Sequence, residues 1–173
     1  RARMPVFDAD LAVHRLQGPR GRALAYIEAL FPGTVRDKTL DRGALRSAVL
    51  GQPDALRRLE GIIHPMVREE EATFLGHARR AGARAVVLDI PLLLETPDID
   101  RVDLVVVVSA PRAVQIHRVA KRGKMTRAQI EAIIARQMPD AEKRARADVV
   151  IRTGLSRFET VRALRRLIAK VLA

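Results

Sequence analysis

Continuous apolar runs, rather than alternating ones, stand out along the chain. They cover residues 85–94, 102–108 and 149–151, and all three are rich in β-branched residues. Such runs are typical of parallel strands that are buried on both faces. A shorter run at residues 5–7 looks like a first strand. Because helical segments separate the runs, the pattern predicts a layered α/β fold with a parallel sheet.

Two helices are predicted in the last third of the chain. Thr126 and Gln129 form a capping-box sequence, which predicts a helix that ends near Gln137. The C-terminal residues carry an apolar stripe at helical spacing, which predicts an amphipathic helix that packs on the sheet. The stripe consists of Val161, Leu164, Leu167, Ile168, Val171 and Leu172.

Residues 14–80 differ in character from the rest of the chain. Prolines, among them Pro65, punctuate this stretch, and it contains no convincing strand. The pattern predicts a helical insertion between the first strand and the strand that begins at residue 85. Its expected helices include residues 42–50, 54–63 and 66–80.

The composition is that of an ordinary globular protein. The chain has 173 residues, of which 48% are hydrophobic and 30% are charged. No apolar run reaches the ~18 residues that a membrane span needs, and the first residues lack the apolar core of a signal peptide. With no cysteine, disulfides, thiolate metal sites and cysteine catalysis are excluded. We therefore expect a soluble cytoplasmic protein.

The net charge of +12 is concentrated in the C-terminal third. Residues 110–173 carry 16 Lys and Arg against 5 Asp and Glu, whereas residues 1–109 are nearly balanced. A basic segment of this kind can serve nucleic acid, an anionic membrane surface or a phosphorylated small molecule. It can also be a solvated face without a partner.

Four carboxylates follow predicted strands. Asp8 and Asp10 come directly after the first run, and Asp89 and Glu95 bracket the proline that ends the second. Ligands of parallel sheets bind just beyond the carboxyl ends of strands, where a carboxylate can accept a proton or bind a cation. The alternatives are that one of the first pair caps the following helix, and that Asp89 pairs with a nearby arginine while Glu95 is solvated.

Cationic and imidazole side chains form the other candidates. Arg118, Lys121 and Arg122 are spaced to share one helical face, as in a lid that closes over phosphates, although a solvated face has the same spacing. His64 lies beside a proline with Arg68 one turn on, where a histidine more often caps or packs. The four histidines show no metal-binding spacing.

Taken in order, these segments resemble the dephospho-CoA kinase family over essentially the whole chain. The motifs DAD-x(3)-H, HP-x-x-R and DIPLL-x-E carry the resemblance. The matching stretches are PVFDADLAVHRL (5–16), LDRGALRSAVL (40–50), LRRLEGIIHPMVREE (56–70), LDIPLLLE (88–95), VDLVVVVSAP (102–111) and ARQMPDAEKRARADVVIRTG (135–154).

The sequence departs from the family at its start. The family has a strand and a phosphate loop, G-x-x-x-x-G-K-[ST], some twenty residues before the DAD motif, and only seven residues precede Asp8 here. We therefore expect a family member without its N-terminal strand and P-loop, and a chain that is inactive as written.

The resemblance implies a P-loop NTPase-type core with a three-layer α/β/α arrangement and two additions. The nucleotide-binding core would comprise residues 1–13, 81–111 and 140–173. Residues 14–80 would be the helical insertion that binds dephospho-CoA, and residues 112–139 a short lid. The implied activity is that of a cytoplasmic kinase in coenzyme A biosynthesis, which transfers phosphate from ATP, with Mg²⁺, to the ribose 3′-hydroxyl of dephospho-CoA. We expect a monomer that binds no membrane and no specific nucleic acid.

The resemblance also assigns roles to the candidate residues. Asp10 would be the general base, Asp8 its partner near Mg²⁺ or its waters without being a direct ligand, and Arg118 the lid arginine. Substrate binding would fall to His64, Arg68, Asp89 and Glu95. ATP and lid contacts would come from Arg122, Arg136, Thr153 and Gly154.

Some of these positions depart from the family pattern. Gly123 replaces the acid that commonly follows Arg122, and Ile133 stands where the family often has an arginine, so that Arg136 is expected to substitute. Thr153 and Gly154 fall where an asparagine is common, which implies that the backbone supplies most contacts to the adenine base.

A basic nucleic-acid-binding domain is the alternative from another class. Only 3% of the residues are aromatic, which leaves few platforms for stacking bases. No helix-turn-helix, zinc-finger or RNA-recognition pattern occurs in the sequence. Both observations count against this alternative.

Overall fold

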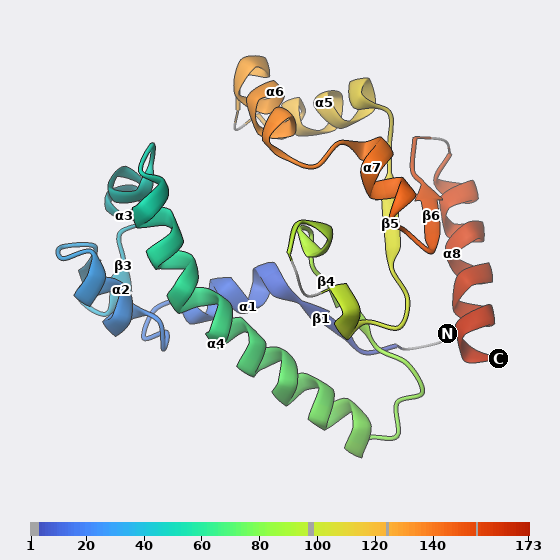
Figure 1. Cartoon of the computed structure of the whole chain (residues 1–173), viewed down its shortest axis with the longest axis horizontal. Helices are drawn as coiled ribbons and strands as arrows, with labels where there is room; N and C mark the ends of the chain where they lie inside the picture. Colours follow the sequence, from blue (N-terminus) through green and yellow to red (C-terminus); the bar gives the residue numbers. More distant parts are fainter. Residues whose placement is uncertain (1–3, 97–98, 124, 155) are drawn as a thin grey trace. The chain divides into compact units, whose positions relative to one another are not determined.

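A computed structural model describes residues 4–96, 99–123, 125–154 and 156–173. The chain forms two compact units, Arg1–Pro91 and Leu92–Ala173 (Figure 1). Each unit contains a parallel pair of strands together with helices, which confirms the predicted mixed α/β class. The predicted division into core, insertion and lid stays a prediction.

The first unit alternates short strands with helices. Its parallel pair consists of a strand near the beginning of the unit and a strand at its end. The elements are β1 (Val6–Asp8), α1 (Ala9–Leu16), α2 (Leu24–Leu30), β2 (Val35–Arg36), β3 (Thr39–Leu40), α3 (Arg42–Val49), α4 (Pro53–Arg80) and β4 (Val87–Asp89).

Helix α4 organises the helical part of the first unit. Helices α1, α2 and α3 all contact it (Figure 1), and Ile63 of α4 is buried in the cluster that they form. The prediction that Pro65 separates two helices is wrong, because α4 runs through it for 28 residues. An interior proline costs a helix about 3 kcal/mol. Burial of the apolar face of α4 against three helices offsets that cost.

A small antiparallel hairpin lies where no strand was predicted. Strands β2 and β3 pair Val35 with Leu40 and Arg36 with Thr39. The two turn residues, Asp37 and Lys38, have φ of 47° and 59°, the left-handed region that a two-residue hairpin turn needs. Neither residue is a glycine, so the usual sequence signal for such a turn is missing.

The second unit contains the other parallel pair and most of the basic residues. Its elements are two 3-10 turns (Leu93–Glu95 and Ile99–Arg101), β5 (Val106–Ser109), α5 (Arg112–Ala120), α6 (Arg127–Arg136), α7 (Asp140–Ala145), β6 (Val149–Arg152) and α8 (Arg157–Leu172). Strands β5 and β6 pair in parallel, and α7 contacts β5 while α8 contacts β6. The apolar centre of this unit includes Leu94, Val105 and Val107.

Burial on both faces, predicted from the continuous runs, is wrong for the strands that form. In β1, Phe7 is 3% exposed, but the preceding Val6 is 57% exposed. In β5, Val107 is 9% exposed and Val108 66%. The elements packed against these strands bury one set of alternate side chains and leave the other set exposed, which periodicity alone does not reveal.

The predicted helix boundaries are confirmed where a local cap defines them. Thr126 and Gln129 form both hydrogen bonds of the capping box at α6. Helix α4 ends at Arg80, before Gly82 with φ of 69°. Helix α8 packs on β6 as predicted, although half of its apolar stripe, including Val161 and Leu164, stays exposed. No helix among the described residues is long and apolar enough to span a membrane.

The Glu28 carboxylate closes the loop that leads into β2. The Glu28 carboxylate accepts hydrogen bonds from the backbone N–H groups of Gly33 and Val35, both at 2.7 Å. These bonds favour the ionised form and therefore lower the pKa of Glu28 from its usual 4.5. The carboxylate thus supplies the acceptors for two loop amides that lie on either side of Thr34 in the sequence.

We expect Glu28→Gln to destabilise the protein at neutral pH and the difference to shrink in acid. A lowered pKa contributes stability above pH 4.5 and loses it as the pH falls through the folded-state value. The measurement is the free energy of unfolding of both proteins from pH 7 to pH 3, with Glu60→Gln on α4 as the control. A difference that stays constant over that pH range would contradict this assignment.

Candidate active site

Acidic residues meet at the carboxyl end of the β1–β4 pair. The parallel register places Phe7 beside Leu88 and Asp8 beside Asp89. Phe7 is buried and its ring lies 5.6 Å from the ring of Phe74 on α4, which anchors the strand. The structure therefore brings together two of the predicted site residues, Asp8 and Asp89, as the strand-end argument required.

Asp8 and Asp10 have different local roles. An oxygen of Asp8 accepts the backbone N–H of Leu11 at 2.8 Å, so Asp8 is the N-cap of α1. Asp10 lies in the first turn of α1, is exposed, and makes no hydrogen bond with any described residue. Asp10 therefore has both oxygens free of described hydrogen-bond partners, whereas Asp8 has one oxygen engaged in the cap.

A histidine–arginine contact in the first unit was not predicted. Arg42 Nη2 lies 3.0 Å from Nδ1 of His14, and because a guanidinium only donates, Nδ1 accepts and the ring proton sits on Nε2. His14 is in α1, four residues after Asp10, and Arg42 begins α3. His14 belongs to the DAD-x(3)-H motif, but no local signal links it to a residue 28 positions away.

His64 and Arg68 lie on α4, one helical turn apart. His64 is exposed and Arg68 is half-buried. Their spacing places them on one face of the helix, in the same unit as the carboxylates. Two other residues of α4, Glu69 and Glu70, form ion pairs with Arg22 of this unit at 3.2 Å each.

In the second unit, Arg118 reaches the loop after β6. Its Nη1 donates to the Thr153 hydroxyl at 3.2 Å and its Nη2 to the Thr153 carbonyl at 2.5 Å. The structure therefore brings together two predicted site residues that are 35 positions apart. Arg118 is exposed near the end of α5, and no described carboxylate forms an ion pair with it.

Ser109 links Thr153 to Asp140, and neither Ser109 nor Asp140 was a candidate from the sequence. The buried Ser109 hydroxyl donates to the Asp140 carboxylate at 2.8 Å, and Arg144 Nε also donates to that carboxylate at 2.8 Å. The Ser109 carbonyl accepts the Thr153 N–H at 2.8 Å. A strand-end serine and an aspartate in a helix's first turn resemble ordinary caps in sequence, so no signal marked them.

Glu95 is held within the second unit. Its carboxylate accepts from Lys143 Nζ at 2.9 Å and from the Met138 N–H at 3.2 Å. The side chains of Glu95 and Lys143 are only 24% and 20% exposed. Glu95 therefore joins three segments of this unit, and the alternative that Glu95 is merely solvated is wrong.

The remaining lid candidates are exposed. The prediction that Arg122 shares a helical face with Arg118 is wrong, because α5 ends at Ala120 and Gly123, with φ of 68°, terminates it. Arg122 therefore lies in the turn beyond the helix, and Arg136 is the last residue of α6. Gly154, which follows Thr153, has no room for a side chain, because a Cβ there would lie 2.4 Å from Cδ of Pro111.

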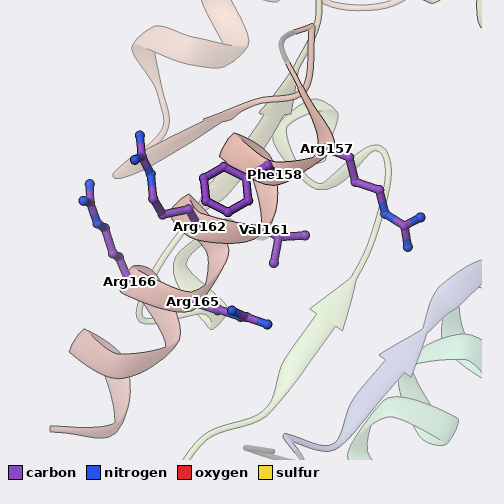
Figure 2. Close-up of a pocket in the computed structure, with 6 residues that line it drawn as sticks. All are labelled: Arg157, Phe158, Val161, Arg162, Arg165 and Arg166. Carbon is purple, nitrogen blue, oxygen red and sulfur yellow. The ribbon is translucent and has the colours of Figure 1, made fainter.

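An arginine-lined groove of about 440 Å³ lies along α8, and none of the predicted site residues lines it (Figure 2). The Arg162 guanidinium lies 5.9 Å from the centre of the Phe158 ring, which is 72% exposed. All six lining residues belong to this one helix, and they are Arg157, Phe158, Val161, Arg162, Arg165 and Arg166. The groove is therefore a surface feature of a basic helix.

The first unit has carboxylates at strand ends, and the second unit has an arginine beside a strand end that no described carboxylate pairs with. These are the side chains that α/β enzymes of phosphate chemistry use, because acids orient hydroxyls or cations and arginines bind phosphate. Among the described residues, no three or more His, Asp or Glu side chains are grouped so that they could hold a metal ion.

Comparison with known proteins identifies the family. The dephospho-CoA kinase family model matches residues 1–156. The dephospho-CoA kinase of Gluconobacter oxydans is 49% identical over 99% of this chain and 87% of its own length, and that of Brucella melitensis is 51% identical over 99% and 82%. The crystal structure of TT1252 from Thermus thermophilus, 34% identical, superposes with a TM-score of 0.80 over 96% of this chain and 84% of its own. The chain belongs to the dephospho-CoA kinase family.

We expect Gly154→Ala to destabilise the protein by about 1–3 kcal/mol, the usual cost of overpacking, because the new Cβ meets the Pro111 ring. Gly61→Ala is the control: a Cβ there meets nothing within 4 Å, and alanine in helix α4 should be neutral or stabilising. The free energy of unfolding from urea denaturation checks both. Equal stability of the Gly154 variant and the parent would show that the loop can move away from Pro111.

Proposed function

We propose that this protein transfers the γ-phosphoryl group of ATP to the ribose 3′-hydroxyl of dephospho-CoA, which yields coenzyme A and ADP. Membership of the family supports the substrates, since curated relatives at about 50% identity carry the name dephospho-CoA kinase. The observation that carries the chemistry is the parallel register of Asp8 and Asp89, with the open carboxylate of Asp10 two residues after Asp8.

Asp10 is the proposed general base. In the transfer, the 3′-oxygen forms a bond to the γ-phosphorus, the bond from that phosphorus to the β,γ-bridging oxygen breaks, and ADP leaves with the bond electrons. The hydroxyl proton moves to the Asp10 carboxylate. Because Asp10 makes no hydrogen bond with a described residue, its oxygens are available to orient the hydroxyl.

Asp8 is the residue that would lie near Mg²⁺ and contact its bound waters rather than the ion itself. Magnesium prefers oxygen ligands, keeps several waters, and uses one or two carboxylates together with substrate phosphates rather than an all-protein cage. A pair of carboxylates at a strand end fits that preference, and one Asp8 oxygen remains after the other caps α1. When bound, the ion would neutralise charge on the phosphate oxygens.

Arg118 is proposed to neutralise the charge on the transferring phosphoryl group. Phosphoryl transfer depends mostly on positioning and electrostatic stabilisation. A positive charge that no carboxylate cancels can therefore stabilise the negative charge on the transferring group. Both observed partners of Arg118 are neutral oxygens of Thr153. Arg122 and Arg136, which are exposed, are proposed to add to this positive field.

Dephospho-CoA is proposed to bind the helical part of the first unit. His64 and Arg68 on α4, and the strand-end Asp89, are the candidate contacts. The exposed imidazole and the carboxylate can hydrogen-bond polar groups, and an arginine suits the pyrophosphate that the substrate carries. Glu95 is proposed to support the second unit through Lys143 rather than to touch the substrate.

The absence of a phosphate loop from residues 1–173 bears on activity. The sequence contains no G-x-x-x-x-G-K-[ST] segment. Such a loop supplies the backbone N–H groups and the lysine that bind the β- and γ-phosphates. We therefore propose that residues 1–173 by themselves bind ATP weakly and transfer phosphate slowly.

The α8 groove gives the nucleic-acid alternative one supporting observation, namely four arginines around an exposed aromatic ring (Figure 2). A single ring offers one stacking platform, and arginines on one helix provide charge without base-specific geometry. We propose that any binding of nucleic acid at this groove is electrostatic and independent of sequence.

We expect Asp10→Asn to lower kcat by about 10²-fold or more, because general-base catalysis contributes that much, with a smaller effect on the KM for ATP. The full-length gene product is assayed for formation of ADP and coenzyme A. Asp103→Asn, an exposed carboxylate in the second unit, is the control and should leave turnover unchanged. An unchanged kcat in Asp10→Asn would remove Asp10 from the mechanism, and absence of coenzyme A formation by the parent would refute the proposed function.

We expect residues 1–173 alone to bind ATP with a Kd at or above about 1 mM, the upper end of ordinary KM values. Isothermal calorimetry in the presence of Mg²⁺ measures this. Micromolar affinity would show that the groups present here suffice for ATP binding and would contradict the proposed dependence on a phosphate loop.

A further inference from the structure

The loop after β6 begins as a continuation of the β5–β6 ladder. In that ladder Ser109 is paired with Arg152, and the next amide, that of Thr153, donates to the Ser109 carbonyl at 2.8 Å. Thr153 therefore occupies a position that the sheet itself determines. Its half-buried side chain is held at the strand end rather than in a free loop.

The Thr153 hydroxyl has both of its hydrogen-bonding functions in use. It donates to the Ser109 carbonyl at 3.2 Å and accepts from Arg118 Nη1 at 3.2 Å. The Thr153 carbonyl accepts from Arg118 Nη2. Two nitrogens of one guanidinium thus bond two oxygens of one residue, and this fork restricts the plane of the guanidinium in a way that a lysine could not reproduce.

The strand end that supports Thr153 is itself braced. The buried Ser109 hydroxyl donates to Asp140, the first residue of α7, and Arg144 of the same helix donates to the same carboxylate. The Asp140 charge is therefore matched by Arg144 and is directed at Ser109, not at Arg118. Asp140 thus stabilises the position of Ser109 and forms no ion pair with Arg118.

This contact with neutral oxygens differs from the ion pairs that engage other cations of the unit. Arg127 pairs with Glu131, Arg146 with Glu142 and Lys143 with Glu95. A carboxylate partner would cancel the positive field that a phosphate needs, whereas a hydroxyl and a carbonyl orient the guanidinium and leave its charge and its other N–H groups available.

We propose that Thr153, supported by Ser109 and Asp140, is a positioning residue that orients Arg118 for the transferring phosphoryl group. This inference rests on the proposed function. It assigns Thr153 a role through Arg118, which differs from the adenine contact that the family resemblance implied. Ser109 and Asp140 thereby become part of the machinery although neither touches a substrate.

The test is a double-mutant cycle on the full-length gene product. Thr153→Val should lower kcat and kcat/KM for ATP together by about fivefold to tenfold, the usual worth of one orienting hydrogen bond. In an Arg118→Ala background the same substitution should have no further effect, because the group it orients is gone. Thr153→Ser, which keeps the hydroxyl, should restore turnover to within about twofold of the parent.

Thr160→Val is the matched control. Thr160 is also half-buried in the second unit, and its hydroxyl bonds only backbone carbonyls, those of Arg152 and Ser156. This variant should behave as the parent. If Thr153→Val and Arg118→Ala multiply independently, or if Thr153→Ser fails to rescue, Thr153 acts structurally and the proposal is overturned.

Binding of inorganic tripolyphosphate, measured by calorimetry, keeps the inference separate from the kinase activity. Thr153→Val should weaken this binding by about threefold in the parent and not at all in Arg118→Ala. A parent that forms no coenzyme A but shows this coupling would refute the proposed function and leave the positioning role supported. A parent that binds no tripolyphosphate, or the same weakening in both backgrounds, would overturn the positioning role.

Discussion

The parallel hydrogen-bond ladders between β1 and β4 and between β5 and β6 determine where the central groups of the candidate site lie. In a parallel pair both chains run the same way, so the residues that follow the two strands emerge at the same end. In the first unit this rule places Asp8 next to Asp89. In the second it carries Thr153 to the end of β5, where Arg118 reaches it. Without either ladder, the residues concerned would be distant positions on a flexible chain.

The charged side chains near the two strand ends differ in their hydrogen-bond and ion-pair partners. Asp8 gives one oxygen to a helix cap, while Asp10 has no described hydrogen-bond partner. Arg118 is held by a hydroxyl and a carbonyl, whereas Glu95 is neutralised by Lys143 in a position that is largely shielded from solvent. Charges that hold the fold together, such as Glu95, are paired, whereas Asp10 and Arg118, which are proposed to act on substrate, form no ion pair with a described residue. That division follows from electrostatics, because a cancelled charge exerts little field on a ligand.

Local signals predicted local structure well. The capping box at Thr126 marks a helix start in the structure, since it requires only neighbours in sequence. The predicted helix break at Pro65 is wrong because the cost of an interior proline depends on neighbouring residues, whereas the burial of α4 against three helices depends on the tertiary fold. The hairpin at Asp37 and Lys38 was missed because its turn contains no glycine. The Arg42–His14 and Ser109–Asp140 contacts join residues about thirty positions apart, and no pattern in the chain connects them.

By itself, the sequence determined the α/β class, the strands that carry the acidic residues, and the family, because hydrophobic runs and short motifs are properties of consecutive residues. Only the tertiary structure decided which carboxylate caps a helix, that Glu95 is engaged by Lys143, that Arg122 lies beyond its helix, and that Thr153 holds Arg118. Those outcomes depend on which side chains packing brings within hydrogen-bond distance. Distances of that kind are set by the whole fold rather than by the order of residues along the chain.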